Sequence, residues 1–220
     1  EKDYFVIEYS KGATLYLPSE QVNEISQYLG GDNPKLNELG GAQFAKAKQK
    51  AKESLKKLAI DLKKVYYERS QTKGFVYPED DELMIAFEDA FDYELTADQQ
   101  TAVNEIKSDM QKGKVMDRLL CGDVGYGKTE VALICAYKHI LSGKQVAFLA
   151  PTTILSMQHY NTAQSRMKPF MVNVALLNRF TPTAEVKRIK QGLKDKTIDM
   201  VIGTHKLLGK DVEFKDLGLL

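Results

Sequence analysis

The chain has 220 residues, of which 43% are hydrophobic and 28% are charged, and its net charge is +1. This composition is that of a globular protein with room for one large domain or two small ones. No apolar run reaches the ~20 residues that a membrane-spanning helix needs, and no secretory signal opens the chain. We therefore expect a cytoplasmic protein that does not contact a membrane.

The first 30 residues predict a β-hairpin followed by a short helix. Two β-rich runs, at 4–9 and 14–17, are separated by a turn in which Gly12 can adopt a positive φ. Because two strands alone do not make a stable sheet, we expect further strands before residue 1 to complete it. Ser19 is expected to cap a helix that runs to Leu29, and a loop follows at 30–34.

A long helix is predicted from Ala42 to about Gln71. Apolar residues recur along it at alternating spacings of four and three, whereas the opposite face is nearly all lysine. The lysine face could contact a nucleic-acid backbone. A solvated linker helix is the favoured interpretation, because no arginine or aromatic residue alternates with the lysines. The apolar seam consists of Ala51, Leu55, Leu58, Leu62 and Val65.

A break at 73–78 marks the expected start of a second region. Residues 79–94 contain eight acidic residues and no basic one. We expect a helix between Glu79 and Ala90, with Leu83, Met84 and Phe87 facing a core and the acidic residues in solvent. The sequence therefore divides into residues 1–30, a linker at 31–76 and a larger domain at 77–220.

From Leu95 onward, helical and strand patterns alternate, which predicts an α/β domain with a parallel sheet wrapped by helices. Ligands of such sheets bind beyond the carboxyl ends of the strands. The expected helices are 97–111, 128–141, 153–167 and 183–192. The expected strands are 116–121, 145–150, 172–177 and 198–203, with another beginning at Leu217.

The segment from Gly122 to Thr129 fits the phosphate-loop pattern G-x-x-x-x-G-K-[ST] between an expected strand and an expected helix. Its glycines allow a tight turn whose N–H groups point into one concavity, and the start of the helix adds a positive field. Lys128 would reach the β- and γ-phosphates of a nucleoside triphosphate, and the Thr129 hydroxyl would bind Mg²⁺. A glycine-rich turn without a ligand is the disfavoured alternative.

Short polar motifs follow the expected strands. Thr96 and Gln99 match a capping box at the start of a helix. The segments 151–153 and 203–205 carry hydroxyl groups that either cap helices or hold phosphates of a nucleic acid. A metal site at His159 or His205 is disfavoured because no third ligand accompanies them. The two cysteines, Cys121 and Cys135, have no metal-binding spacing and are expected to be reduced thiols in the core.

In order and spacing, these motifs resemble those of superfamily 2 helicases and translocases. The resemblance implies a first RecA-like lobe, ATP as the nucleotide and Gln99 as the residue that reads adenine. The implied nucleotide-binding residues are Gln99, Gly122, Asp123, Val124, Gly125, Tyr126, Gly127, Lys128, Thr129 and Glu130, with Lys128 and Thr129 catalytic and Thr129 on Mg²⁺. The implied DNA-binding residues are Thr152, Thr153, Gln158, Arg179, Gly203, Thr204 and His205.

Within superfamily 2, the chain resembles the bacterial transcription-repair coupling factor family over essentially its whole length. The resemblance is carried by the loop with Tyr126 and Glu130 and by the segments 15–18, 35–41, 77–83 and 177–180. It implies that residues 1–30 are part of a Tudor/SH3-like barrel that binds the RNA polymerase β subunit near Tyr16 and Leu17. It also implies ATP-driven translocation on double-stranded DNA that displaces stalled polymerase, and recruitment of nucleotide excision-repair proteins through regions outside this chain.

One departure from that family limits the expected activity. The chain ends at 218–220, where the family continues into an acidic box that holds Mg²⁺ and positions the attacking water. We therefore expect a truncated lobe that binds nucleotide weakly and hydrolyses it negligibly. Two alternatives remain open: another superfamily 2 helicase of the fork-remodelling type, and a non-enzymatic adaptor that binds polymerase.

Overall fold

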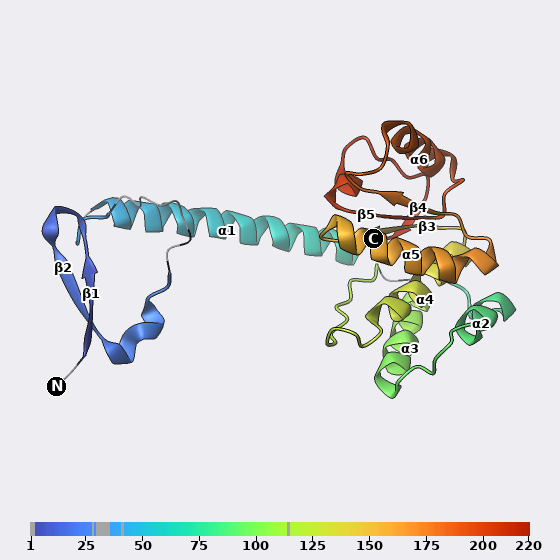
Figure 1. Cartoon of the computed structure of the whole chain (residues 1–220), viewed down its shortest axis with the longest axis horizontal. Helices are drawn as coiled ribbons and strands as arrows, with labels where there is room; N and C mark the ends of the chain where they lie inside the picture. The colour runs from blue at the N-terminus through green and yellow to red at the C-terminus, as the bar shows by residue number, and fades with distance from the viewer. Residues whose placement is uncertain (1–2, 28, 30–35, 41, 114) are drawn as a thin grey trace. The chain divides into compact units, whose positions relative to one another are not determined.

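The computed structural model describes residues 3–27, 29, 36–40, 42–113 and 115–220. The chain divides into two compact units, Glu1–Arg69 and Ser70–Leu220. Figure 1 shows a hairpin and a long helix in the first unit and an α/β domain in the second. The loop expected at 30–34 lies outside the described residues, and the three-part division of the sequence stays a prediction.

The first unit begins with the expected hairpin. β1 (Tyr4–Glu8) and β2 (Thr14–Pro18) are antiparallel, with Val6 opposite Tyr16 and Phe5 opposite Leu17. The connecting 3-10 turn η1 (Ser10–Gly12) contains positive φ angles at Lys11 and Gly12. Tyr4, Phe5, Val6 and Tyr16 are all exposed, so the hairpin presents aromatic and aliphatic side chains to its surroundings.

The short helix after the hairpin differs from its prediction. It is a 3-10 helix, η2 (Ser19–Glu24), and Pro18 occupies the cap position without a side-chain hydrogen bond. The expected Ser19 cap was therefore wrong, because Ser19 is already inside the helix. Ile25 has extended backbone angles, which end the helix well before Leu29.

The long helix is confirmed as α1 (Ala42–Gln71), which has 30 residues. Both its lysine face and its apolar seam are exposed in the described residues. Leu55 and Leu62 keep 65% and 50% of their accessible surface, so the seam is only weakly covered.

The second unit contains a four-stranded parallel sheet with the strand order β4-β5-β3-β6. Four of its five helices coincide with helical patterns expected from the sequence after Leu95, and α2 lies within the expected acidic helix. The strands are β3 (Gln145–Leu149), β4 (Val174–Leu177), β5 (Met200–Gly203) and β6 (Leu217–Leu219). The helices are α2 (Glu82–Asp89), α3 (Ala97–Gln111), α4 (Lys128–Leu141), α5 (Thr153–Met167) and α6 (Thr183–Asp195), with 3-10 turns η3 (Lys168–Phe170) and η4 (His205–Leu208).

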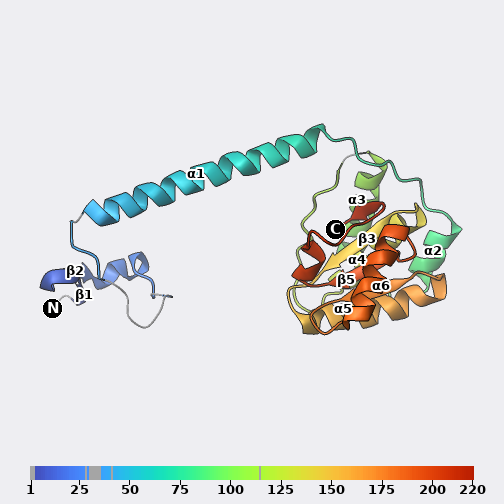
Figure 2. The same cartoon turned by 90° about the horizontal axis from the view of Figure 1, so that it is seen from above.

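Alternate strand residues face two separate cores. On one face, Val146, Met200 and Ile202 pack in the cluster that contains α2, α3, α4 and α5. On the other face, Ala147 and Val201 pack in the cluster that contains α6 and η4. Figure 1 shows the helices on these two sides of the sheet, and Figure 2 looks onto the side that α6 covers. The domain is therefore a three-layer α/β arrangement.

The strand expected at 116–121 was wrong: these residues form no β-strand. A strand needs a neighbour that takes up its backbone N–H and C=O groups. β3 is already paired on both sides, by β5 and β6. β6 spans only Leu217–Leu219, so it offers a short edge. A cavity of about 360 Å³ lies between the 116–120 segment, β3 and β6.

The acidic segment before α3 is fastened to the domain by ion pairs. Lys138 is buried on α4, and its Nζ donates to the Pro78 carbonyl at 2.8 Å and to Asp80 at 2.6 Å. Lys107 of α3 pairs with Asp80 at 2.6 Å and also with Glu88. The segment is thus held by charge as well as by apolar contact.

α2 is rotated relative to its prediction. Met84 and Phe87 are buried, whereas Leu83 is 55% exposed. Asp81 caps the helix by accepting from the Met84 N–H at 2.9 Å. The inward role expected for Leu83 was wrong: helical spacing allows either Leu83 or Met84 to share a face with Phe87, and in the domain it is Met84 that packs inward.

A buried amide joins the sheet to the segments around it. The Gln145 side chain is completely buried at the start of β3. Its Nε2 donates to the carbonyls of Leu193 and Ile198 at 3.0 and 2.8 Å. Its Oε1 accepts from the N–H groups of Lys215 and Asp216 at 3.0 and 3.1 Å. One side chain therefore connects β3 to α6, to the approach to β5 and to the approach to β6.

We predict that Gln145→Leu lowers the unfolding free energy by about 3 kcal/mol, because it leaves buried backbone donors and acceptors unpaired. Urea denaturation followed by circular dichroism measures the change. Gln191→Leu is the control, since Gln191 is exposed and its amide bonds only the nearby Asp195. Equal effects of the two substitutions would contradict the role given to the buried amide.

We also predict acid-sensitive stability at Asp80. Burial alone would raise the pKa of Asp80, but the hydrogen bonds and charges of Lys107 and Lys138 outweigh it and hold the pKa below its ordinary value. A carboxyl with a depressed pKa in the folded state stabilises at neutral pH and loses that contribution as pH falls. The unfolding free energies of the native chain and Asp80→Asn should therefore converge between about pH 5 and pH 2. Asp92→Asn is the control, because Asp92 is exposed. Its unfolding free energy should differ from that of the native chain by the same small amount at every pH.

Candidate nucleotide and nucleic-acid site

The phosphate loop lies directly before α4, as its sequence predicted. Gly125 and Gly127 have φ values of 85° and 67°, in the left-handed region that favours glycine. A Cβ atom at Gly127 would lie 2.4 Å from the Gln99 Nε2. Glycine is therefore needed at 127 both for the turn and for the close approach of a neighbouring side chain. The loop residues 122–127 are exposed to solvent.

Lys128 begins α4 and folds back over the loop. Its Nζ donates to the Gly122 carbonyl at 2.7 Å and to the Asp123 carbonyl. Thr129 follows it in the first turn of the helix, where unpaired N–H groups and the helix dipole favour an anion. These residues fit a nucleoside triphosphate: an ammonium, a hydroxyl and a helix N-terminus lie at one turn.

Gln99 connects the start of α3 to the phosphate loop. Its Oε1 accepts from the Thr96 N–H at 2.8 Å, and its own N–H donates to the Thr96 Oγ1 at 3.3 Å. These two bonds confirm the capping box. In addition, the Gln99 Nε2 donates to the Tyr126 carbonyl at 2.8 Å. The residue expected to read adenine is thus already in hydrogen-bond contact with the loop.

Glu130 was expected among the nucleotide-binding residues, and the structure gives its side chain another contact. Glu130 is buried, and its Oε1 accepts from the Arg166 Nε at 3.0 Å and Nη2 at 2.8 Å. The carboxylate is therefore engaged by α5 rather than by the loop.

The strand-end residues predicted to bind DNA come from three neighbouring strands. Thr152 follows β3, and its Oγ1 accepts from the Leu155 N–H at 3.2 Å, so it caps α5. Arg179 follows β4 and is exposed, with its guanidinium 4.7 Å from the centre of the Phe180 ring. His205 follows β5 and is also exposed. The parallel pairing of β3, β5 and β4 brings these three ends to one edge of the sheet.

Two predicted DNA contacts are buried. Thr204 keeps 4% of its accessible surface, so its hydroxyl is largely removed from solvent. Gly203 pairs with Leu177, and a Cβ at Gly203 would lie 2.2 Å from the Leu177 carbonyl oxygen. Glycine at 203 is thus required by the packing of β5 on β4. Thr153 is half-buried, and Gln158 is exposed on α5.

Sequence reasoning missed the residue that ties these strand ends together. The Asn178 side chain is buried and donates to the Ser156 Oγ at 3.2 Å while accepting from the Phe180 N–H at 2.9 Å. The Asn178 carbonyl also accepts from the Lys206 Nζ at 3.3 Å. The only available signal was the polar pair Asn178 and Arg179 directly after an apolar strand.

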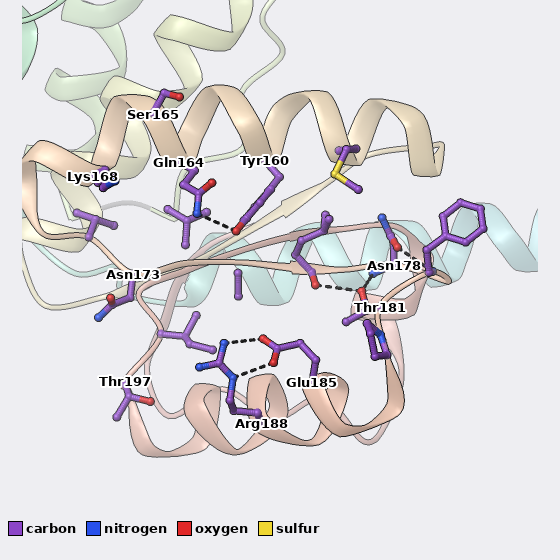
Figure 3. Close-up of a pocket in the computed structure, with 18 residues that line it drawn as sticks. Tyr160, Gln164, Ser165, Lys168, Asn173, Asn178, Thr181, Glu185, Arg188 and Thr197 are labelled. Carbon is purple, nitrogen blue, oxygen red and sulfur yellow. Dashed lines mark hydrogen bonds and ion pairs between the residues drawn. The ribbon is translucent and has the colours of Figure 1, made fainter.

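A cavity of about 950 Å³ lies away from the phosphate loop, along β4 between α5 and α6 (Figure 3). Figure 3 shows the Gln164 amide bonded to the Tyr160 hydroxyl and the Glu185 carboxylate paired with Arg188. Asn178, together with Ser156, Phe180 and Lys206 that it bonds, forms a strand-end cluster. Because Asn178 also lines the cavity, the cavity borders this cluster. None of the residues predicted to bind nucleotide lines this cavity.

The described residues contain no cluster of three His, Cys, Asp or Glu side chains suited to a metal ion. His159 packs against Phe148 at a ring distance of 4.9 Å, and burial lowers its pKa.

Cys121 is exposed beside Gly122, so its expected place in a core was wrong. Without a β-strand at 116–121, the side chain of Cys121 is not packed into the sheet. In the described part of the chain, no helix is long and apolar enough to cross a membrane.

The family model described as DEAD/DEAH box helicase matches residues 96–220, which include the phosphate loop and the strand-end residues. The chain belongs to the DEAD/DEAH box helicase family. A second model, CarD-like/TRCF RID domain, matches residues 1–29, which contain the hairpin.

Individual relatives agree with both family matches. The transcription-repair-coupling factors of Staphylococcus haemolyticus and Staphylococcus aureus (strain USA300) are 49% and 48% identical to the chain over 221 residues. Each alignment covers 100% of this chain and 19% of the relative, so the chain spans about a fifth of the relatives' length. These similarities confirm the resemblance to transcription-repair coupling factors.

The similarity to a solved structure supports the fold. RecG bound to a three-way DNA junction is 41% identical, with a TM-score of 0.66 over 71% of this chain and 22% of the RecG chain. Together with the helicase-family match, this similarity confirms the RecA-like parallel sheet with flanking helices.

The two cysteines of this helicase lobe should differ in reactivity. Cys135 is buried, and burial raises the pKa of its thiol to about 12, whereas Cys121 is exposed beside the phosphate loop. Because the thiolate is the reactive species, we predict that one thiol per folded chain reacts rapidly with Ellman's reagent and that Cys121→Ser abolishes this phase. Rapid labelling of two thiols in the folded chain would contradict the placement of Cys135 in the core.

Proposed function

We propose that this chain is the nucleotide-binding part of an ATP-dependent translocase that acts on double-stranded DNA and displaces stalled RNA polymerase. The observation that carries the proposal is the glycine loop at the start of α4, with Lys128 folded over it and Gln99 bonded to it. The family membership and the similarity to transcription-repair-coupling factors support it.

Lys128 would exchange the Gly122 and Asp123 carbonyls for the β- and γ-phosphate oxygens of ATP. The Thr129 hydroxyl would provide an oxygen ligand for Mg²⁺, an ion that prefers such hard donors. The bound ion would neutralise phosphate charge during phosphoryl transfer. Gln99 would exchange at least one of its present hydrogen bonds for a hydrogen bond to the edge of the adenine base.

The strand-end residues would hold the DNA backbone. Arg179 and His205 are exposed there, and backbone N–H groups at 152–153 and 203–205 lie on the same edge. Such phosphate contacts carry no sequence information directly, which suits a protein that moves along DNA of any sequence.

The hairpin would bind the RNA polymerase β subunit. Its side chains at Tyr16 and Val6 are exposed and face each other across the ladder, and residues 1–29 match the CarD-like/TRCF RID domain. Leu17, half-buried beside Tyr16, would complete the contact. Excision-repair proteins would be recruited by regions outside this chain.

The first test is titration of a fluorescent ATP analogue in the presence of Mg²⁺. We expect Lys128→Ala to weaken binding at least tenfold, because the ammonium that neutralises the phosphates is lost. Lys210→Ala is the matched control, since Lys210 is an exposed lysine after η4, remote in sequence from the loop. Equal affinities of native and Lys128→Ala chains would refute the assigned site.

The second test separates this proposal from a fork-remodelling helicase, an alternative that fits the similarity to RecG bound to a three-way DNA junction. We expect the chain to capture purified polymerase β subunit and Tyr16→Ala to reduce capture severalfold, since an exposed aromatic residue is removed from the hairpin. Tyr93→Ala, at an exposed position in the second unit, should bind as the native chain does. No capture of the β subunit by the native chain favours the fork-remodelling alternative, whereas capture that Tyr16→Ala leaves unchanged removes Tyr16 from the contact.

A further inference from the structure

Arg166, near the end of α5, lies in the interior of the second unit. Its side chain is 11% exposed, and that of its partner Glu130 is 6% exposed. Both the Nε and an Nη atom donate to one carboxylate oxygen, at 3.0 and 2.8 Å. A buried charge left without its partner is strongly unfavourable, so this pair resists separation.

The same guanidinium also holds α2. Its Nη2 donates to the Phe87 carbonyl, and its Cζ atom lies 4.0 Å from the Phe87 ring centre and 5.6 Å from that of Phe91. One arginine therefore joins three helices, α2, α4 and α5.

Glu130 occupies a particular place in α4. It follows Lys128 and Thr129 in the first turn, and its N–H donates to the Gly127 carbonyl at 3.0 Å. Fixing the Glu130 side chain therefore fixes the orientation of the turn that presents the lysine and threonine to a ligand.

The other end of α5 carries the strand-end cluster. Thr152 caps the helix there, and Ser156 accepts from Asn178. Ser156 and Arg166 are ten residues apart on one helix, a distance of about 15 Å along its axis. α5 thus extends from the support of the phosphate loop to the edge where the exposed strand-end residues lie.

We propose that Glu130 and Arg166 are positioning residues that couple the phosphate loop to the strand-end cluster through α5. Glu130 does not touch the nucleotide in this account; it holds Thr129 and Lys128 in place through Arg166. Ligand binding at the loop then changes the local stability of residues 152–156. Ligand binding at the strand ends likewise changes the local stability of the loop. The identity of these ligands, a nucleotide at the loop and DNA at the strand ends, rests on the proposed function.

The test is hydrogen exchange measured by mass spectrometry, with Cys121 labelling as a second reporter at the loop. Native chain is compared with Glu130→Gln, Arg166→Met and Arg166→Lys. Arg188→Met is the matched control, because Arg188 makes a bidentate pair with Glu185 that is exposed to solvent on α6. Far-UV circular dichroism establishes that each variant is folded; if Arg166→Met is not, the other two variants decide.

Without nucleotide, we expect the substitutions at 130 and 166 to speed exchange severalfold at 122–130 and at 152–156, and to speed Cys121 labelling. Arg166→Lys keeps the charge and should rescue part of the effect. Exchange in the β1–β2 hairpin should be unchanged. Acceleration that is uniform through residues 70–220, or absent from 122–130, overturns the proposal, since either result assigns the pair a merely structural role.

With a non-hydrolysable ATP analogue and Mg²⁺, exchange in the native chain should slow at 122–130 and at 152–156. In Glu130→Gln, the loop should still be protected while 152–156 is not. Protection of both segments in that variant overturns the coupling. If the native chain binds no nucleotide, the proposed function fails for this chain, whereas the exchange pattern without nucleotide still decides whether the pair positions the loop.

Discussion

The parallel pairing of β3, β4 and β5 is the constraint on which the rest of the second unit depends. Parallel strands end at the same edge of a sheet, so the residues that follow β3, β4 and β5 meet there whatever their distance in the sequence. Gly203 allows the close approach of β5 to β4 at that edge. Thr152, Arg179 and His205 lie at the same edge of the sheet for this reason.

Buried polar side chains keep that arrangement fixed. Gln145 joins β3 to the approaches of β5 and β6, and Asn178 joins two strand ends to α5. Asp80 and Glu130 add charged contacts from the acidic segment and from α4. Each of these groups has its hydrogen-bond partners, so it stabilises one arrangement and disfavours others, in which the same buried group would be unpaired.

The helices of the second unit could be predicted closely from the sequence because their signals are local. Thr96 and Thr152 cap α3 and α5, Gly127 precedes α4, and the apolar periodicity runs through each helix. The phosphate loop was predictable for the same reason: its pattern is contiguous, and Gly125 and Gly127 adopt the positive φ angles that its turn needs. The hairpin was also recognisable from its turn and its β-rich runs.

The errors arose where structure depends on distant residues. The apolar run at 116–121 has strand composition, but a strand also needs a partner with a free edge. The sequence pattern did not distinguish Leu83 from Met84 as a buried position, because Lys107 and Lys138 help fix the segment that precedes α2. Arg166 gave no sequence signal, and the polar pair at 178–179 did not show what Asn178 would bond, since both side chains bond residues on other elements.

The central claim is that Gln99, Lys128 and the loop between them form an adenine-nucleotide site. Calorimetric titration of the chain with Mg-ATP and with Mg-GTP tests it most directly, because the phosphates are identical and only the base differs. The account predicts measurable ATP binding and at least tenfold weaker GTP binding, with the difference removed by Gln99→Ala. Equal affinities for the two nucleotides, or a preference that survives Gln99→Ala, would contradict it.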